Sequence, residues 1–258
     1  MPATAMVASV MDERGNAAAT ADREAERAAM VERQLMARGV RDLAVLAAMR
    51  SVPREVFVPG NLAEFAYDDR PLPVQAGQTI SQPYVVGFAI EALGIGPDDR
   101  VLEIGSGTGY AVAVLARIAR EVYGVERHGE LVQAARRRLS RLGLANVGIV
   151  QGDGTKGLPE HAPYDAILVS AGGPSVPQAL REQLAVGGRL VIPIGRAGDQ
   201  ELVRVTRRGE AEWEEQPLGG VSFVPLIGEQ GWQAADSSPS GSAASASAPG
   251  SATARPGR

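Results

Sequence analysis

The sequence has no cysteine and little histidine, and both shortages narrow the chemistry that it can carry. Without a cysteine among its 258 residues, disulfides, thiolate metal sites and cysteine nucleophiles are excluded. His128 and His161 are its two histidines, which gives little support to a histidine metal cluster or a Ser-His-Asp triad. We expect both rings to lie at the surface, and we expect no metal site.

Long apolar runs and an excess of positive charge are also missing. The chain has no stretch of about eighteen apolar residues, and no basic segment leads into a long apolar one near its start. Its formal net charge is −4, so no basic field points to nucleic acid or to an anionic membrane surface. We therefore expect a soluble, cytoplasmic protein that binds neither nucleic acid nor membrane.

Composition divides the chain into three parts. Residues 1–21 are alanine-rich and weakly patterned, which predicts a flexible leader. Residues 234–258 are mostly Ser, Ala, Pro and Gly, and such a segment buries too little apolar surface to offset its ordering entropy. We expect this tail to be disordered, and we expect one catalytic domain over residues 22–233.

Strands and helices alternate through the middle of that domain. Two helices are expected first, at 22–38 and 41–49. Strands are then expected at 101–104, 121–126, 147–151, 163–172 and 187–195, with helices between them at 110–116, 128–141 and 176–184. This alternation predicts a mainly parallel sheet with helices on both faces, and two later segments, 201–206 and 213–226, predict an antiparallel end. The expected fold is α/β and Rossmann-like, with a seven-stranded sheet and a helical N-terminal segment.

Three glycines at alternate positions follow the first of those strands. Gly105, Gly107 and Gly109 stand before an apolar helix, and Glu103 stands before the first glycine. Glycine permits the backbone angles of a tight turn and lets a ligand lie against the peptide groups. The G-x-G-x-G spacing differs from the G-x-G-x-x-G of dinucleotide sites, which disfavours a dehydrogenase. The alternative is a turn that only packs the helix against the strand.

Two acids follow the next two strands. Glu126 ends the strand at 121–126 and lies 21 residues after the first glycine, close to the spacing at which an acid reaches a ribose. Asp153 follows the strand at 147–151, where it could hold an adenine edge or another polar group. The structural alternatives are an exposed acid at a helix start for Glu126 and an ordinary Asp-Gly turn for Asp153.

A polar segment, Gln78-Thr79-Ile80-Ser81-Gln82-Pro83, precedes an apolar helix over residues 84–93. Serine is a good N-cap, and proline is well tolerated in the first turn of a helix. Taken by itself, this segment is therefore better interpreted as a helix start capped by Ser81 than as a functional site.

Together, these segments resemble one family. The resemblance covers roughly residues 25–230 and is to the protein-L-isoaspartate O-methyltransferases, which are class I S-adenosylmethionine (SAM) methyltransferases. The glycine loop by itself indicates only a methyltransferase, whereas the Thr-Ile-Ser-Gln-Pro segment and the closing Phe-Val-Pro-Leu are specific to this family. The matching segments are Gln78 to Pro83, the glycine loop, Val125-Glu126-Arg127, Gly152-Asp153-Gly154, Pro163-Tyr164-Asp165-Ala166-Ile167 and Phe223-Val224-Pro225-Leu226.

The resemblance implies an activity. SAM would give its methyl group to the α-carboxyl of L-isoaspartyl residues in damaged proteins, and the ester would close to a succinimide as the first step of repair. The substrates would be isoaspartyl peptides and proteins, the enzyme would need no metal, and we expect it to be a monomer. An isoaspartyl carboxyl is ionised at neutral pH, so this nucleophile needs no general base.

The resemblance also implies the site. Ser81 would be the active-site serine with Thr79 beside it, and Ser81 is better suited to positioning the carboxylate than to attacking. Glu103 would support the glycine loop, Glu126 would bind the ribose, and Asp153 with Gly154 would meet the adenine. Residues 223–226 would form one wall of the peptide groove, and the alternative for them is a plain edge strand that contains a proline. The full cofactor set is Gln78, Ile80, Glu103, Gly105, Ser106, Gly107, Thr108, Gly109, Glu126, Arg127, Asp153 and Gly154.

Two other functions fit the same fold. One is a SAM-dependent carboxyl methyltransferase that acts on a maturing peptide or a small molecule; such relatives usually carry a folded C-terminal region, and here that region is of low complexity. The other is a SAM-binding module without catalysis, which the presence of Ser81 beside the full cofactor set disfavours.

Overall fold

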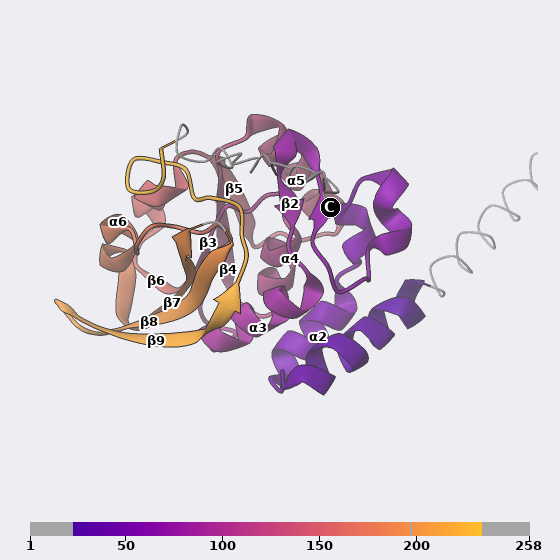
Figure 1. Cartoon of the computed structure of the whole chain (residues 1–258), viewed down its shortest axis with the longest axis horizontal. Coiled ribbons are helices and arrows are strands. Elements are labelled where there is room, and N and C mark those ends of the chain that lie inside the picture. The colour runs from indigo at the N-terminus through magenta and orange to yellow at the C-terminus, as the bar shows by residue number, and fades with distance from the viewer. Residues whose placement is uncertain (1–22, 197, 234–258) are drawn as a thin grey trace, which may run out of the picture.

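The computed structural model describes residues 23–196 and 198–233. The predicted leader and tail lie outside these residues. The described chain forms one large sheet with helices on both faces (Figure 1), which confirms the predicted α/β fold. No described helix is both long enough and apolar enough to cross a membrane.

The sheet has seven strands in the order β5-β4-β3-β6-β7-β8-β9. The first five strands in this order pair in parallel, and β8 and β9 add an antiparallel end, as the sequence predicts. The strands are β3 (Arg100–Ile104), β4 (Glu121–Glu126), β5 (Val147–Gln151), β6 (Tyr164–Val169), β7 (Leu184–Arg196), β8 (Asp199–Gly209) and β9 (Glu212–Val221). A separate antiparallel pair joins β1 (Leu72–Pro73) to β2 (Thr79–Ile80).

Helices cover the two faces unequally. One apolar cluster packs α2, α3, α4 and α5 against the sheet, and a second packs α6 against the opposite face. The α-helices are α2 (Leu43–Ser51), α3 (Pro83–Leu93), α4 (Tyr110–Ala116), α5 (Gly129–Arg141) and α6 (Gln178–Glu182). Short turns of helix are η3 (Arg54–Phe57), η4 (Gly60–Phe65), η5 (Gln75–Gly77), η6 (Gly154–Lys156) and η7 (Pro159–His161).

The N-terminal helical segment packs at one end of the molecule. A helix over residues 23–30 continues through η1 (Val31–Leu35) and η2 (Met36–Arg38) and ends at Gly39, whose φ of +100° confirms the predicted stop. The next helix, α2, begins two residues later than predicted because the Asp42 carboxylate caps it, accepting the N–H groups of Ala44 and Val45. The segment contacts α3 and α4 (Figure 1).

Two local predictions were wrong. Gln82, with φ −58° and ψ 145°, is the N-cap residue of α3, and the Gln82 side chain makes no capping hydrogen bond. Ser81 therefore stands one residue too early to cap it. His161 is half-buried instead of lying at the surface, and its ring stacks on Tyr123 with the ring centroids 4.0 Å apart.

Candidate active site

The glycine loop joins β3 to α4 at the carboxyl edge of the parallel strands. Gly105, Gly107 and Gly109 have φ values of +74°, +52° and +91°, which favour glycine at all three positions. The N–H groups of Gly105 and Ser106 donate to the Val125 carbonyl at 2.8 and 3.2 Å, so the loop is fixed to the neighbouring strand β4. A concave turn of backbone results, with its position set by the sheet.

Glu126 lies against this loop. It is 5% exposed, and its two carboxylate oxygens accept the N–H groups of Gly107 and His128, each at 2.9 Å. Each oxygen keeps a further lone pair, so the carboxylate can accept hydroxyl donors as well. The predicted ribose acid and the predicted glycine loop are thus brought together.

Glu103 is buried beneath the loop at the end of β3. It is 2% exposed, its Oε1 accepts the Ser170 hydroxyl at 2.7 Å, and its Oε2 has no hydrogen-bond partner among the described residues. Burial raises the pKa of Glu103 to about 8; the hydrogen bond from Ser170 opposes this shift, and the nearby Glu126 charge adds to it. A buried carboxyl with a free oxygen fits a ligand that brings an N–H donor.

Asp153 stands at the edge of a second cavity of about 340 Å³. Its Oδ1 accepts the N–H and hydroxyl of Thr155 at 2.9 and 2.7 Å, and its Oδ2 accepts the N–H of Glu229 at 2.9 Å. Desolvation raises the pKa of Asp153, but these hydrogen bonds outweigh it and hold the pKa below its ordinary value. The cavity is lined by Arg127, Gln151, Gly152, Asp153, Ile227 and Gly228.

This cavity contains residues that the sequence analysis missed. Ile227 and Gly228 come from the C-terminal segment, more than seventy residues after Asp153, and no local pattern pointed to them. Gly154, predicted to contact the cofactor, has a packing role in addition, because a Cβ there would lie 2.5 Å from Ile104 Cγ2. Thr108 is also buried.

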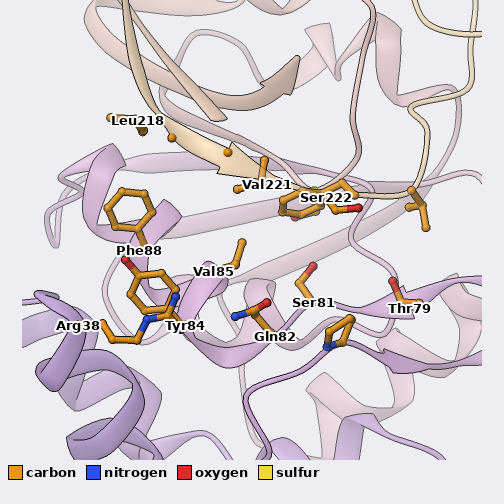
Figure 2. A pocket seen from close by; sticks show the side chains of 16 residues that line it. Arg38, Thr79, Ser81, Gln82, Tyr84, Val85, Phe88, Leu218, Val221 and Ser222 are labelled. Carbon is orange, nitrogen blue, oxygen red and sulfur yellow. The ribbon is translucent and has the colours of Figure 1, made fainter. Parts of the chain in front are cut away.

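Ser81 lines a cavity of about 640 Å³ between α3 and the end of β9 (Figure 2). Thr79, Ser170 and Phe223 line it as well. The other two residues predicted on this segment do not: Ile80 is buried in the core, and Gln78 donates to the Ala76 carbonyl. Thr79 and Ser81 alone therefore present their hydroxyls to the cavity from this segment.

Asp69 caps α3 in place of Ser81. Its Oδ1 accepts the N–H of Tyr84 in the first turn at 3.2 Å. The Ser81 hydroxyl takes part in no hydrogen bond found among the described residues. It is half-buried and faces the cavity in Figure 2, so it remains available to a bound ligand.

Arg54 holds the backbone at Ser81. Its guanidinium is fully buried and donates to the carbonyls of Ala66 and Ser81 at 2.7 and 2.8 Å. It also lies 4.7 Å from the ring centroid of Tyr110, the first residue of α4. Burial lowers the pKa of Arg54 from its ordinary value. One side chain thus connects the Ser81 segment to the helix that follows the glycine loop.

Ser170 connects the glycine loop to the Ser81 cavity. Ser170 lines the Ser81 cavity and donates to Glu103 beneath the glycine loop. Ser81, Ser170 and Ala111 of α4 also line one small enclosed space. A ligand on the glycine loop and a ligand at Ser81 would therefore be neighbours. The described residues hold no group of three acidic or histidine side chains placed to bind a metal ion.

Known proteins share this arrangement of sequence and structure. The sequence profile of the protein-L-isoaspartate(D-aspartate) O-methyltransferase (PCMT) family matches residues 25–231. The chain belongs to this family. Protein-L-isoaspartate O-methyltransferase 2 of Pelobacter propionicus is 58% identical over 212 residues, which are 82% of this chain and 94% of that protein. Protein-L-isoaspartate O-methyltransferase of Methylorubrum extorquens is 59% identical over 206 residues, 80% and 90% of the two chains.

Solved structures agree with this membership in the PCMT family. A protein-L-isoaspartate O-methyltransferase structure superposes with a TM-score of 0.71 at 31% identity, covering 80% of this chain and 67% of that one. A Plasmodium falciparum protein described under the same activity, solved with S-adenosyl-L-homocysteine, superposes with a TM-score of 0.67 at 27% identity, covering 78% and 98%. The predicted family, fold and isoaspartyl methyltransferase activity are confirmed.

Proposed function

We propose that this PCMT-family chain methylates the α-carboxylate of L-isoaspartyl residues with SAM held on the glycine loop and the carboxylate held at Ser81. One observation carries the proposal. The free Ser81 hydroxyl opens into a cavity whose wall residue, Ser170, is hydrogen-bonded to Glu103 under the loop. The carboxylate that accepts the methyl group and the SAM molecule that donates it would therefore lie on either side of Ser170.

The residues around the loop fit SAM. The three glycines leave room for the methionyl part, Glu126 can accept the ribose hydroxyls, and the cavity beside Asp153 and Arg127 lies where an adenine would follow. The unpartnered Oε2 of Glu103 suits the cationic amino end of the cofactor. When bound, SAM supplies a methyl group activated by its cationic sulfur.

The acceptor cavity suits an anion. Among the described residues that line it, Arg38 is the only charged one, and its charge is balanced by its ion pair with Asp69. The hydroxyls of Ser81 and Thr79 can each donate a hydrogen bond to a carboxylate oxygen and fix its direction. The acceptor is already ionised at neutral pH, so neither hydroxyl has to move a proton.

Orientation and exclusion of water then supply the catalysis. The reaction joins an anionic oxygen to a methyl group on a cationic sulfur, so charge is neutralised as the bond forms. A site that holds oxygen, carbon and sulfur in line and removes water from the carboxylate favours that transition state. Arg54 contributes by fixing the backbone at Ser81. The hydrogen bond from Ser170 to Glu103 fixes the surface between the SAM site and the carboxylate site.

A single copy of the chain would bind the damaged protein. We propose that the chain acts as a monomer, which light scattering after gel filtration would test. Its place in the cytoplasm stays a prediction.

The test of the proposed function uses two peptides that differ only in one L-isoaspartyl or L-aspartyl residue. Each is incubated with the full chain and methyl-labelled SAM, and base-labile methyl ester is counted. We expect label in the isoaspartyl peptide alone. Equal labelling of both peptides would disprove the proposed selectivity. SAM binding without labelling of either peptide would indicate that the methyl acceptor is instead a maturing peptide or a small molecule.

A further inference from the structure

The Ser81 cavity continues along α3 to an aromatic end that methyl transfer itself does not need. Here Tyr84 and Phe88 lie nearly parallel, with ring centroids 5.7 Å apart and an interplanar angle of 11°. Leu218 and Val221 of β9 face them across the cavity (Figure 2). We call these four residues the aromatic cleft. All four side chains are half-buried, so an apolar surface is open to the cavity.

Contacts within the chain hold the cleft in place. The guanidinium of Arg38 lies 3.4 Å from the ring centroid of Tyr84 and pairs with Asp69 at 2.5 Å. Asp69 also accepts the N–H of Tyr84, so the ring is fixed at its backbone and at one face. Binding to a surface that is already ordered costs little conformational entropy.

The walls leave room for a side chain. Gly219 and Gly220 lie in β9 between the two apolar wall residues and also line the cavity. A Cβ placed on either glycine would meet no atom within 4 Å. The space above the rings is therefore open, and it is continuous with the space at Ser81.

The charges in the cleft favour an uncharged occupant. Arg38, the only charged residue among the described residues of the lining, already lies on the Tyr84 ring. Its positive charge opposes a lysine or arginine at that place, and its pairing with Asp69 leaves little attraction for an acid. An apolar or aromatic side chain gains most, because it removes the exposed ring surface from water.

The geometry also gives the position of that side chain. Phe88 lies six residues after Gln82, the cap residue next to Ser81, which is about 9 Å along a helix that rises ~1.5 Å per residue. An extended peptide advances ~3.3 Å per residue. A peptide with its isoaspartate at Ser81 would therefore bring the side chain two to three residues away, by this roughly estimated count, over the rings.

We infer that the aromatic cleft is a subsite that selects isoaspartyl substrates carrying an apolar or aromatic side chain two to three residues from the damaged position. This inference rests on the proposed function, because it takes the isoaspartyl carboxylate to lie at Ser81. The occupant is argued from continuity: the cleft and the Ser81 hydroxyl line one cavity.

The test begins with the unaltered full chain and a set of isoaspartyl peptides. The parent peptide has serine and glutamine at every other position, and phenylalanine or lysine replaces them one at a time within about four residues of the isoaspartate on either side. Phenylalanine at two to three residues on one side should raise kcat/KM about tenfold, with little effect elsewhere. Lysine at the same place should lower it. A flat profile would overturn the subsite and leave the proposed function standing.

Variants of the wall residues test whether the preference for phenylalanine arises at the aromatic cleft. Phe88→Ser should reduce the phenylalanine-to-glutamine ratio of kcat/KM to near one, and Leu218→Ala, on the opposite wall, should reduce it in part. Phe65→Ser is the matched control, since Phe65 is half-buried like Phe88 but lies outside the cavity, with Arg70 4.7 Å from its ring centroid. An unchanged ratio in both cleft variants would overturn the subsite. Absence of methylation for every peptide would overturn the proposed function, and the subsite with it.

Discussion

The Asp69 carboxylate accepts the N–H of Tyr84 at 3.2 Å and so caps α3 from fifteen residues upstream. A helix start normally takes its cap from the residue directly before it. Because Asp69 meets that need, the Ser81 hydroxyl two residues before the helix is left to the cavity. The same carboxylate binds Arg38, so one side chain orders both the helix start and the aromatic cleft.

Replacing Ser81 by alanine should separate function from stability. The change removes a hydroxyl with no intramolecular hydrogen bond among the described residues, so the free energy of unfolding should move by less than about 0.5 kcal/mol. Loss of one donor to the reacting carboxylate should lower kcat about 10- to 100-fold, while the Kd for SAM stays within a few fold. The measurements are peptide methylation, SAM titration and denaturant unfolding. Ser51→Ala, which removes a serine hydroxyl bonded to Ala48 at the end of α2, is the control and should keep full kcat.

Asp69→Ala should lower both stability and substrate affinity. Loss of a helix cap costs about 1 kcal/mol, and it also frees Arg38 and the start of α3. We expect a higher KM for isoaspartyl peptide as well as a lower unfolding free energy. Asp42→Ala removes the equivalent cap from α2, whose residues do not line the Ser81 cavity, and should cost similar stability with KM unchanged. Equal effects of the two variants on KM would show that Asp69 acts only through stability.

Local patterns predict some features of the fold and of the candidate site. The alternation of strands and helices, the turn of the glycine loop and the position of Glu126 at the end of a strand follow from periodicity and spacing, because each is encoded by neighbouring residues. The cap at Ser81 failed for a physical reason. Pro83 is the first helical residue, which makes Gln82 the cap and leaves the Ser81 side chain short of the free N–H groups.

Other features depend on contacts between distant residues. Arg54 reaches Ser81 across 27 residues, and the Asp153 carboxylate meets the Glu229 backbone across 76. A buried arginine leaves no sign in a sequence, because arginine is ordinarily exposed. Such pairs are set by how the elements pack, so the structure was needed to find them.

Arg54→Lys should impair the Ser81 segment while preserving the positive charge. A lysine cannot donate to two carbonyls as the guanidinium fork does, so a buried carbonyl of Ala66 or Ser81 loses its partner. Each such loss costs about 1–3 kcal/mol of stability. We expect kcat/KM for peptide to fall about tenfold with the Kd for SAM almost unchanged, because the glycine loop keeps its own hydrogen bonds.

Arg136→Lys is the matched control for that variant. Arg136 also donates twice to a backbone carbonyl, that of Ile149, but lies on α5 away from Ser81. A lysine can still donate to this single carbonyl, so the variant should lose little stability and should keep its kcat/KM. A fall in SAM affinity as large as the fall in peptide kcat/KM would mean that Arg54 supports the whole fold and not the Ser81 segment.

Glu103 should make the protein less stable as pH rises. Its pKa is raised by burial from 4.5 to about 8 in the folded chain, so between these values the folded state holds a proton that the unfolded state has lost. Unfolding then releases a proton, and the free energy of unfolding falls as pH increases through that window and levels off above about pH 8. The total loss from this group is on the order of a few kcal/mol.

Glu103→Gln imitates the protonated carboxyl and should remove this slope. In the absence of SAM, denaturant unfolding at several pH values from about 5 to about 8 should show a steep decline for the unaltered chain and a flatter one for the variant. The variant should therefore be the more stable protein at the upper end of the range. Glu121→Gln, at an exposed carboxylate paired with Arg100, should retain the original slope. If Glu103→Gln retained it too, another group would have to carry the titration, and the Glu103 carboxylate would be ionised beneath the glycine loop at neutral pH.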